Sequence, residues 1–409
     1  MPVRLDLLPQ AAPRPAPIRL WLWFALLVVF LVVGAGWVLL FATPPQHQSA
    51  LGLWAPGVGV PLLVWSALAF VRACTYIGQQ QVALGWDQAR EEALSRQIRC
   101  GRRSLQVLGA SLYSALRAPG QSGAAQLQGL LDGNRAIKAQ ATRVSDAAVR
   151  HSRLASGPSE ALEDVVLDTL QAVLGELSVT LEKLPVETPL ALLLEVKSGL
   201  PDNLFMRVWR EAWSASGIRQ PTVSVEGSGL AAVDLWLDRR INDQAVLMVI
   251  ALQFASDQPA AAEVAAGLLL GNRLTQTTLT PLAYLHRPEL AREPGSEHVL
   301  YAARLALDWV PLAASGIGHI WRSGINAQQG AAITAVLNQL SMPAKSEQKL
   351  CDLDACLGHA GCASPWLAIA AATNNLARGA GPQFIFSAGS SVETDLWSTV
   401  MTPAPALSK

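Results

Sequence analysis

Two long apolar runs near the start constrain this chain more than any other feature. Residues 20–41 and 50–71 contain no charged side chain. An α-helix rises about 1.5 Å per residue, so about 20 apolar residues cross a hydrocarbon core of roughly 30 Å. Only the short segment 42–49 separates the two runs. The pattern therefore predicts an N-terminal transmembrane helical hairpin that occupies residues 20–72 and follows a tail at residues 1–19.

The distribution of arginine predicts the orientation of this hairpin. Arginines flank both outer ends, whereas segment 42–49 contains no Lys or Arg. The positive-inside rule then places both termini in the cytoplasm of a bacterium, with two spans in its inner membrane. A cleaved signal peptide fits poorly, because the first run is longer than a signal core and a second run follows at once. A buried helical hairpin in a soluble core is the alternative. The flanking arginines are Arg4, Arg14, Arg19, Arg72, Arg90, Arg96, Arg99, Arg102 and Arg103.

Charge and motifs exclude several classes of function. The chain has 31 basic and 31 acidic residues, and this balance argues against a nucleic-acid partner, which requires a basic face. Neither a Walker A motif nor a G-x-G-x-x-G motif after a strand occurs, so ATP and NAD have no support as cofactors. The five cysteines should stay reduced in the cytoplasm. Cys351, Cys356 and Cys362 with His359 lack the paired spacing of common zinc sites, so free thiols are expected and no metal is predicted.

The rest of the chain has the pattern of a large α/β domain at residues 104–402, joined by a linker helix at 73–103 and followed by a tail at 403–409. Apolar runs of strand length alternate there with longer helical patterns, as in a sheet that is covered on both faces. Two polar, weakly patterned stretches, 118–160 and 286–298, are expected to be surface excursions. The expected strands are 104–113, 189–197, 245–254 and 265–272, and the expected helices are 159–182, 202–216, 229–240, 327–340 and 364–377.

The order of these segments resembles the thiolase-like fold, and most closely the β-ketoacyl synthases, over residues 104–402. The segment TVSVEGSGLAAVDLWL at 222–237 resembles the nucleophile strand and helix of that family. RSGINAQQG at 322–330 resembles its first histidine motif, and CLGHAGCASPW at 356–366 resembles its second. FIFSAGSSVE at 384–393 resembles the terminal glycine-rich turn. The resemblance implies an αβαβα layered domain behind the membrane hairpin.

The residues at the catalytic positions of that resemblance depart from the family. A cysteine thiolate at a helix N-terminus attacks an acyl thioester there, and two histidines stabilise its oxygen. In this chain the alignment places Glu226 at the cysteine position, with Gly227 or Ser228 if the register shifts. Ser323 stands at the first histidine, and only His359 is kept. The lysine that usually precedes it falls on Asp354. The ordinary interpretations are a helix-stabilising role for Glu226 and a hydrogen-bonded, buried His359.

This departure predicts that the protein is not an enzyme, because none of Glu226, Ser323 and His359 is a thiol. The expected function is a pseudoenzyme that acts as a membrane-anchored scaffold or adaptor on the cytoplasmic side. The resemblance implies a protein partner, as a homodimer or pseudo-heterodimer, and an accessory role in bacterial type VI secretion. Alternatives are a partner of an acyl-chain enzyme, similar to chain-length factors or to decarboxylating ketosynthases, and a membrane immunity protein. A serine hydrolase with Ser228, Asp234 and His359 is disfavoured, because no G-x-S-x-G motif occurs.

Overall fold

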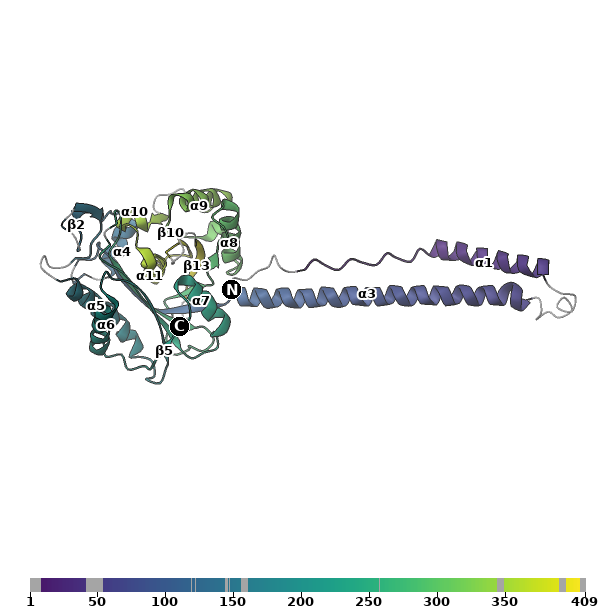
Figure 1. Cartoon of the computed structure of the whole chain (residues 1–409), viewed down its shortest axis with the longest axis horizontal. Helices are drawn as coiled ribbons and strands as arrows, with labels where there is room; N and C mark the ends of the chain where they lie inside the picture. Colours follow the sequence, from purple (N-terminus) through teal and green to yellow (C-terminus); the bar gives the residue numbers. More distant parts are fainter. Residues whose placement is uncertain are drawn as a thin grey trace. The chain divides into compact units, whose positions relative to one another are not determined.

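The computed structural model describes residues 9–41, 54–118, 120–121, 123–143, 146, 148–155, 161–256, 258–343, 349–389 and 395–404. Contacts between residues divide the chain into two compact units, Arg4–Gln97 and a larger one that contains Ile98–Lys409. The first is helical, and the second contains the sheet (Figure 1). Each unit is described separately below.

The helical unit consists of α1 (Leu20–Phe41), a short π-helix η3 (Ala55–Gly59) and the first part of α3 (Val60–Gly101). Gly34 of α1 lies so close to η3 that an added Cβ would come within 2.4 Å of the Gly57 carbonyl oxygen. The Trp65 indole N–H donates to the Trp23 carbonyl across the same pair at 2.9 Å. Small residues at such contacts allow helices to approach closely. The apolar helices therefore pack side by side as a hairpin.

The apolar side chains of this hairpin face outward. Two helices, Leu20–Leu40 and Ala55–Gly101, are long and apolar enough to cross a membrane, and only 6% and 11% of their most apolar windows are buried. An apolar helix in a soluble core would be mostly buried, and a large exposed apolar surface needs a lipid or protein neighbour. α3 continues without a break into its polar part after Arg72. The second apolar run and the predicted linker helix are thus one helix.

An extended N-terminal segment, residues 9–19, lies along the polar part of α3 (Figure 1). Asp87 accepts the Ala12 backbone N–H at 3.0 Å and pairs with the Arg14 guanidinium at 3.0 Å. Arg90 donates to the Pro9 carbonyl at 2.8 Å. Both sides of the hairpin's open end are therefore tied together by polar contacts.

The larger unit is built on an 11-stranded sheet within the described residues, in the order β11-β10-β12-β13-β8-β1-β7-β6-β4-β5, with β9 paired to β13. Strand burial is almost complete at the centre, where β6 and β7 have no exposed residue. The strands are β1 (Ser104–Tyr113), β4 (Leu190–Lys197), β5 (Thr222–Ser224), β6 (Val246–Gln253), β7 (Val264–Asn272), β8 (Ala283–His286), β9 (Glu289–Leu290), β10 (His319–Ser323), β11 (Leu350–Asp352), β12 (Gln383–Ser387) and β13 (Trp397–Pro403).

The sheet consists of two halves with the same topology, β1-β7-β6-β4-β5 and β8-β13-β12-β10-β11. Each half has three mutually parallel strands at its outer edge and an antiparallel strand next to them. The halves meet where β1 pairs antiparallel with β8. The helices follow the same repeat in chain order: α5 (Leu162–Leu181), α6 (Asp202–Ala215) and α7 (Gly229–Arg239), then α8 (Ser296–Asp308), α9 (Ala327–Gln339) and α11 (Ser364–Ala377), which follows the short α10 (Leu353–Leu357).

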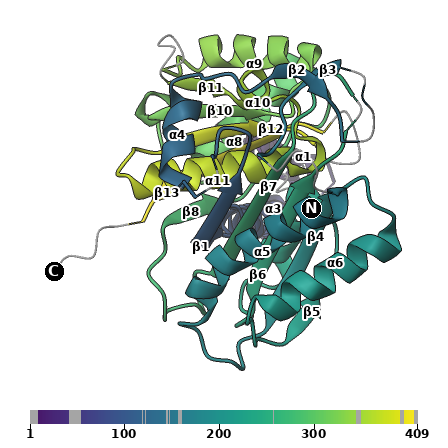
Figure 2. The same ribbon diagram turned by 90° about the vertical axis from the view of Figure 1, so that its left-hand side faces the viewer.

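Three apolar cores show that the domain is layered. One lies between the first half and α5 and α6, and another lies between the second half and α8 and α9. The third contains α7 and α11 together with inward residues of both halves. Figure 2 shows α5 and α6 on one side of the molecule and α9 on the opposite side, with α11 between them. This helix–sheet–helix–sheet–helix order confirms the predicted layered α/β fold.

The expected strands and helices agree with the structure to within a few residues, but the two predicted surface excursions are only partly exposed. Within 118–160, α4 (Gly123–Leu131) places Leu127 and Leu130 in the central core, each 0% exposed. Within 286–298, Arg287 is 1% exposed. The buried residues in both segments are few, and some of them are charged. The hydrophobic pattern of the sequence therefore did not reveal their burial.

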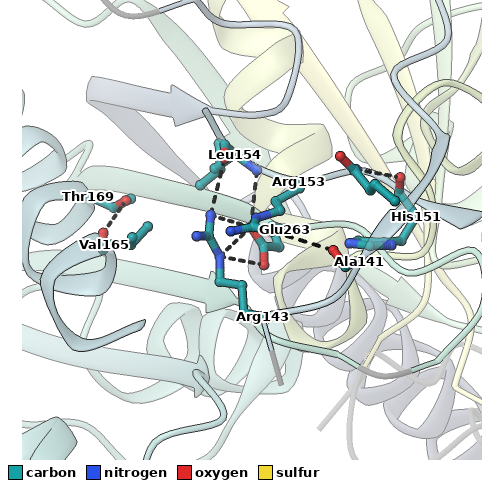
Figure 3. Close-up of polar contacts among 9 residues, drawn as sticks. Ala141, Arg143, His151, Arg153, Leu154, Val165, Thr169 and Glu263 are labelled. Carbon is teal, nitrogen blue, oxygen red and sulfur yellow. Dashed lines mark hydrogen bonds and ion pairs between the residues drawn. The ribbon is translucent and has the colours of Figure 1, made fainter. Parts of the chain in front are cut away.

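One of these charged contacts attaches a hairpin, β2 (Lys138–Ala141) with β3 (Ala148–His151), to the sheet (Figure 3). Arg143 and Glu263 form a bidentate pair, with the Nε–Oε1 and Nη2–Oε2 distances both 2.9 Å. Their side chains are 2% and 4% exposed. The backbone N–H of Leu154 also donates to Glu263. Buried charges are stable only when paired and hydrogen-bonded in this way.

Candidate functional site

The N-terminal end of the buried helix α11 brings together three polar residues that the sequence singled out, Ser323, Asp354 and His359. We call the group formed by Ser323, Asp354, His359, Cys362 and Ser364 the α11 site. β10 ends at Ser323, α10 contains Asp354, and the turn at 358–363 leads into α11. Every residue of α11 from Ser364 to Thr373 is buried, so these groups lie at the foot of the central helix.

Asp354 fixes the turn that follows β10. Its two carboxylate oxygens accept the backbone N–H groups of Gly324 and Ile325 at 2.9 and 2.8 Å. Burial raises the pKa of Asp354, whereas these two bonds and the nearby His359 act in the opposite direction. Asp354 therefore stabilises backbone at the position where the family has a lysine.

His359 lies in the same turn, but its side chain is exposed rather than buried as expected. Its Nδ1 accepts the Gly361 backbone N–H at 3.0 Å, which leaves the proton of the neutral ring on Nε2. Its backbone N–H donates to the Ala260 carbonyl at 2.7 Å. The imidazole is thus oriented by the turn and open to solvent.

Ser323 is buried completely at the end of β10, and its hydroxyl has no hydrogen-bond partner among the described residues. Backbone fills the space around it. Gly324, with φ of +74°, would place a Cβ 2.1 Å from the Ala388 carbonyl oxygen. Gly389 would place one 2.3 Å from the Gly361 carbonyl oxygen. Only glycine fits at these two positions, where the glycine-rich turn closes on the foot of α11.

Cys362 is the thiol of the α11 site. Its Sγ lies 3.6 Å from the carbonyl oxygens of Glu195 and Leu252 and 4.0 Å from Gln253 Oε1. Burial, and after it the charge of Glu195, raises the pKa of the Cys362 thiol to about 11. A thiol must ionise to act as a nucleophile, so this environment disfavours catalysis.

Glu195 also occupies the N-terminus of α7, the helix that resembles the nucleophile helix. The Gly229 backbone N–H, at the first position of α7, donates to Glu195 Oε1. Burial raises the pKa of Glu195, and the bond from Gly229 opposes this rise. A carboxylate from β4 therefore takes the place where the positive end of a helix would stabilise a thiolate or an oxyanion.

Glu226 is not part of this arrangement. It is exposed and pairs with Arg239 at 3.1 Å, and Ser228 is the N-cap residue of α7. The expected helix-stabilising contact therefore belongs to Glu195 rather than to Glu226. The structure brings Ser323 and His359 together through Asp354, whereas Glu226 precedes α7 and pairs with Arg239 at the far end of that helix. The sequence analysis did not single out Glu195, and it named Cys362 only as a free thiol. The signal that could have found Glu195 is an acidic side chain directly after the apolar run LALLL of β4.

The remaining cysteines do not extend the site. Cys351 is buried and donates to the Leu130 carbonyl at 3.2 Å, and Cys356 is buried beside it. Neighbouring Cys356 and burial raise the pKa of Cys351. Among the described residues, no three His, Cys, Asp or Glu side chains lie close enough together to hold a metal ion.

Comparison with solved structures supports the fold of the larger unit. The sequence matches no family model and no curated protein. Solved structures match over about three quarters of the chain. PfaC keto synthase–chain length factor has a TM-score of 0.53 and 12% identity, covering 74% of this chain and 43% of its own. The ishigamide ketosynthase/chain length factor has a TM-score of 0.51 and 17% identity, covering 73% and 99%. The ketosynthase from module 6 of the Bacillus subtilis bacillaene synthase has a TM-score of 0.52 and 10% identity, and the match covers 74% of this chain and 71% of that one.

The layered domain therefore has the thiolase-like fold of the ketosynthases, as the sequence resemblance predicted. Identities of 10–17% establish the fold alone. Function has to be argued from the site, because one fold supports many activities.

Proposed function

We propose that this protein is a catalytically inactive ketosynthase-like adaptor, anchored in the bacterial inner membrane with its domain in the cytoplasm. The bond from the Gly229 N–H to the Glu195 carboxylate is the observation that supports inactivity most directly. The Glu195 carboxylate lies at the N-terminus of α7, where an anionic intermediate would have to bind. Ser323 stands at the position that the resemblance aligns with a histidine. The only thiol of the α11 site, Cys362, has a raised pKa.

The membrane location is supported by the two outward-facing apolar helices and by the arginines beyond their outer ends. The contacts of the segment 9–19 with α3 keep both outer ends on one side of the hairpin, as a two-span anchor requires. The positive-inside rule then gives the cytoplasmic side. A cysteine-accessibility assay in intact cells, with a cysteine introduced at Gln46, tests this orientation. Labelling of Q46C from outside the inner membrane is expected, and labelling only after lysis would contradict it.

Inactivity is tested on the full chain in detergent. The protein is incubated with acetyl and malonyl thioesters of an acyl carrier protein, and intact mass and carbon dioxide release are measured. The unaltered protein is expected to show no more acylation and no more decarboxylation than the His359→Ala variant, which sets the background. An acyl adduct on Cys362 that disappears in Cys362→Ala would refute the proposal and identify an enzyme.

The adaptor part of the proposal requires a protein partner, and the edge strand β5 is the place we assign to it. Thr222, Val223 and Ser224 are all exposed, and β5 is the last strand of its half. An unpaired edge strand can extend the sheet into a neighbouring chain. We propose a dimer of two copies, or a pairing with a homologous subunit, through this edge. Native mass spectrometry of the full chain should show a dimer that Val223→Glu weakens at least tenfold. The variant Val223→Thr serves as control, and a monomer, or a dimer indifferent to both changes, would contradict this assignment.

A second candidate is a partner of an acyl-chain enzyme, because two of the similar structures are described as ketosynthase and chain length factor. In that case an active ketosynthase would occupy the β5 edge, and co-expression would change the length of its acyl product. Accessory roles in type VI secretion and in immunity stay predictions from the sequence resemblance.

A further inference from the structure

A cavity of about 350 Å³ lies where the two halves of the sheet meet, far along the chain from the α11 residues. It is covered by the loop 273–282, which joins β7 to β8. The loop is held at both ends: Asn272 accepts the N–H groups of Thr275 and Gln276, and the Leu282 N–H donates to the Val107 carbonyl at 2.8 Å. We call this cavity the Gln106–Gln276 pocket, and it is lined by Gln106, Arg273, Gln276, Thr277, Thr278, Leu279, Thr280, Pro281 and Tyr284.

Strand register places the polar residues of the pocket on one face. Gln106 of β1 lies opposite Gly271 of β7 on one side and Tyr284 of β8 on the other. Side chains that are paired across neighbouring strands share a face. Because Gly271 has no side chain, Gln276 lies over it, 3.0 Å from where a Cβ would be. The two glutamines are therefore neighbours on the outer face of the sheet.

Both glutamines are buried, and polar atoms of each have no hydrogen-bond partner among the described residues. Each is 7% exposed. Gln106 Oε1 and both Oε1 and Nε2 of Gln276 have no partner among the described residues. A buried amide without partners costs stability, and such groups in native structures need an explanation. These three atoms are closed off from solvent, so a ligand reaches them only after the two carboxamides turn toward the cavity, and this turn breaks no hydrogen bond of the three atoms to the described residues.

The charge of the pocket is positive. Arg273 lies over the Tyr284 ring, with its guanidinium carbon 4.8 Å from the ring centre. Among the described residues that line the pocket, none is acidic, and three threonines add hydroxyl groups. Burial, and then Arg273, lower the pKa of the adjacent His286 to about 4, so this histidine is neutral and adds no charge. Guanidinium and hydroxyl groups together suit a phosphate.

We propose that the Gln106–Gln276 pocket binds a guanine nucleotide of monophosphate size. The unmet groups of the two glutamines are two acceptors and one donor. Guanine presents the complement on its pairing edge, with two neighbouring donor groups, N1–H and N2–H₂, and one acceptor, O6. The phosphate would lie on Arg273 and the threonine hydroxyls. This site is separate from the α11 site, so the proposal does not depend on inactivity.

Isothermal titration calorimetry of the full chain in detergent tests the proposal, with guanosine monophosphate, adenosine monophosphate, uridine monophosphate and inorganic phosphate as separate probes. Guanosine monophosphate should bind at least tenfold more tightly than the other three. Gln276→Leu should remove this preference, and Arg273→Gln should weaken binding at least tenfold. Arg292→Gln is the matched control, because Arg292 lies over Tyr301 in the same manner elsewhere.

Thermal unfolding of Gln276→Leu without ligand separates a binding role from a structural one. If Gln276 serves a ligand, its replacement by leucine leaves the unliganded protein as stable or more stable. Equal binding of all four probes, binding of phosphate alone, absence of any binding, or binding that Gln276→Leu and Arg273→Gln leave unchanged would each overturn the proposal.

Discussion

The reactivity of Cys362 tests the chemistry of the α11 site directly. A thiol with a pKa of about 11 is about one part in a thousand ionised at pH 8, compared with about one part in four for an ordinary thiol of pKa about 8.5. The rarer thiolate is about tenfold more nucleophilic, since reactivity follows pKa with a slope of about 0.4–0.5. We therefore expect Cys362 to react with iodoacetamide about twentyfold more slowly than a cysteine of pKa about 8.5 in an unstructured peptide in the same solution. The rate should rise tenfold per pH unit up to about pH 10.

The measurement is peptide-resolved mass spectrometry of the full chain in detergent, in a Cys74→Ala, Cys100→Ala background that removes the two other accessible thiols. Replacement of the neighbouring charge in Glu195→Gln should lower the pKa of Cys362 and raise its rate at pH 8 about twofold or more. Glu226→Gln is the control and should change nothing, because Glu226 pairs with Arg239 at the surface. Alkylation of Cys362 at pH 8 as fast as the cysteine of the unstructured peptide would refute the argument, since it would show an activated thiolate.

Three further predictions concern stability, each measured by urea unfolding of the full chain and followed by a tryptophan signal of the domain. Arg143→Ala should cost about 3–5 kcal/mol by leaving Glu263 buried without its partner, whereas Arg207→Ala, which breaks an exposed pair with Glu163, should cost at most about 1 kcal/mol. Equal costs would contradict the first. Gly101→Ala should destabilise the domain by about 1–3 kcal/mol, because its Cβ would lie 2.6 Å from the Trp309 ring, while Gly85→Ala, with open space around it, should not. Burial raises the pKa of Glu289 to about 7 against a bond from the Trp309 N–H. The folded state therefore holds a proton that the unfolded state has lost, and stability should fall by about 3 kcal/mol as pH rises from about 4.5 to 7. A slope that persists in Glu289→Gln would exclude this residue as its source.

The fold was predictable where burial is continuous. β1 and α11 have the predicted bounds, because β1 is a buried strand of ten residues and α11 lies wholly in the core. Such segments leave an unbroken apolar pattern in the sequence. The hydrophobic pattern placed α4 in a surface excursion, because its contribution to the core comes from Leu127 and Leu130 among glycine, alanine and glutamine. A pattern of two buried residues in a polar stretch is too short to distinguish from a loop.

The site was less predictable because its contacts cross the chain. Ser323 and His359 could be placed by local motifs, since each is next to a glycine with positive φ, Gly324 and Gly358. The exposure of His359 depends on the segment at 260–262, which the motif does not include. The Glu195 contact joins residues that are 34 positions apart, and no local pattern records it. Glu226, chosen by alignment with a helix start, was two residues from the N-cap and faces another element.

Under the proposed function, the carboxylates near the N-terminal ends of α7 and α11 stabilise the backbone rather than take part in a reaction. Asp354 holds the turn after β10, and Glu195 holds the first N–H of α7. Both carboxylates accept backbone N–H groups. An enzyme for acyl transfer needs such N–H groups free, so that they can donate to the oxyanion. Preorganised N–H groups accelerate acyl transfer only when they point at an empty position for the developing oxyanion. The Gly229 N–H already donates to the Glu195 carboxylate, so it can stabilise an oxyanion only if that carboxylate moves away. Glu195 is held in a strand whose residues are mostly buried or half-buried, and among the described residues its carboxylate has no other hydrogen-bond or ion-pair partner that would favour such a move. Under the proposed function, the absent thiol and the occupied N-terminus of α7 both prevent condensation, so we predict that a single Ser323→His change does not produce it.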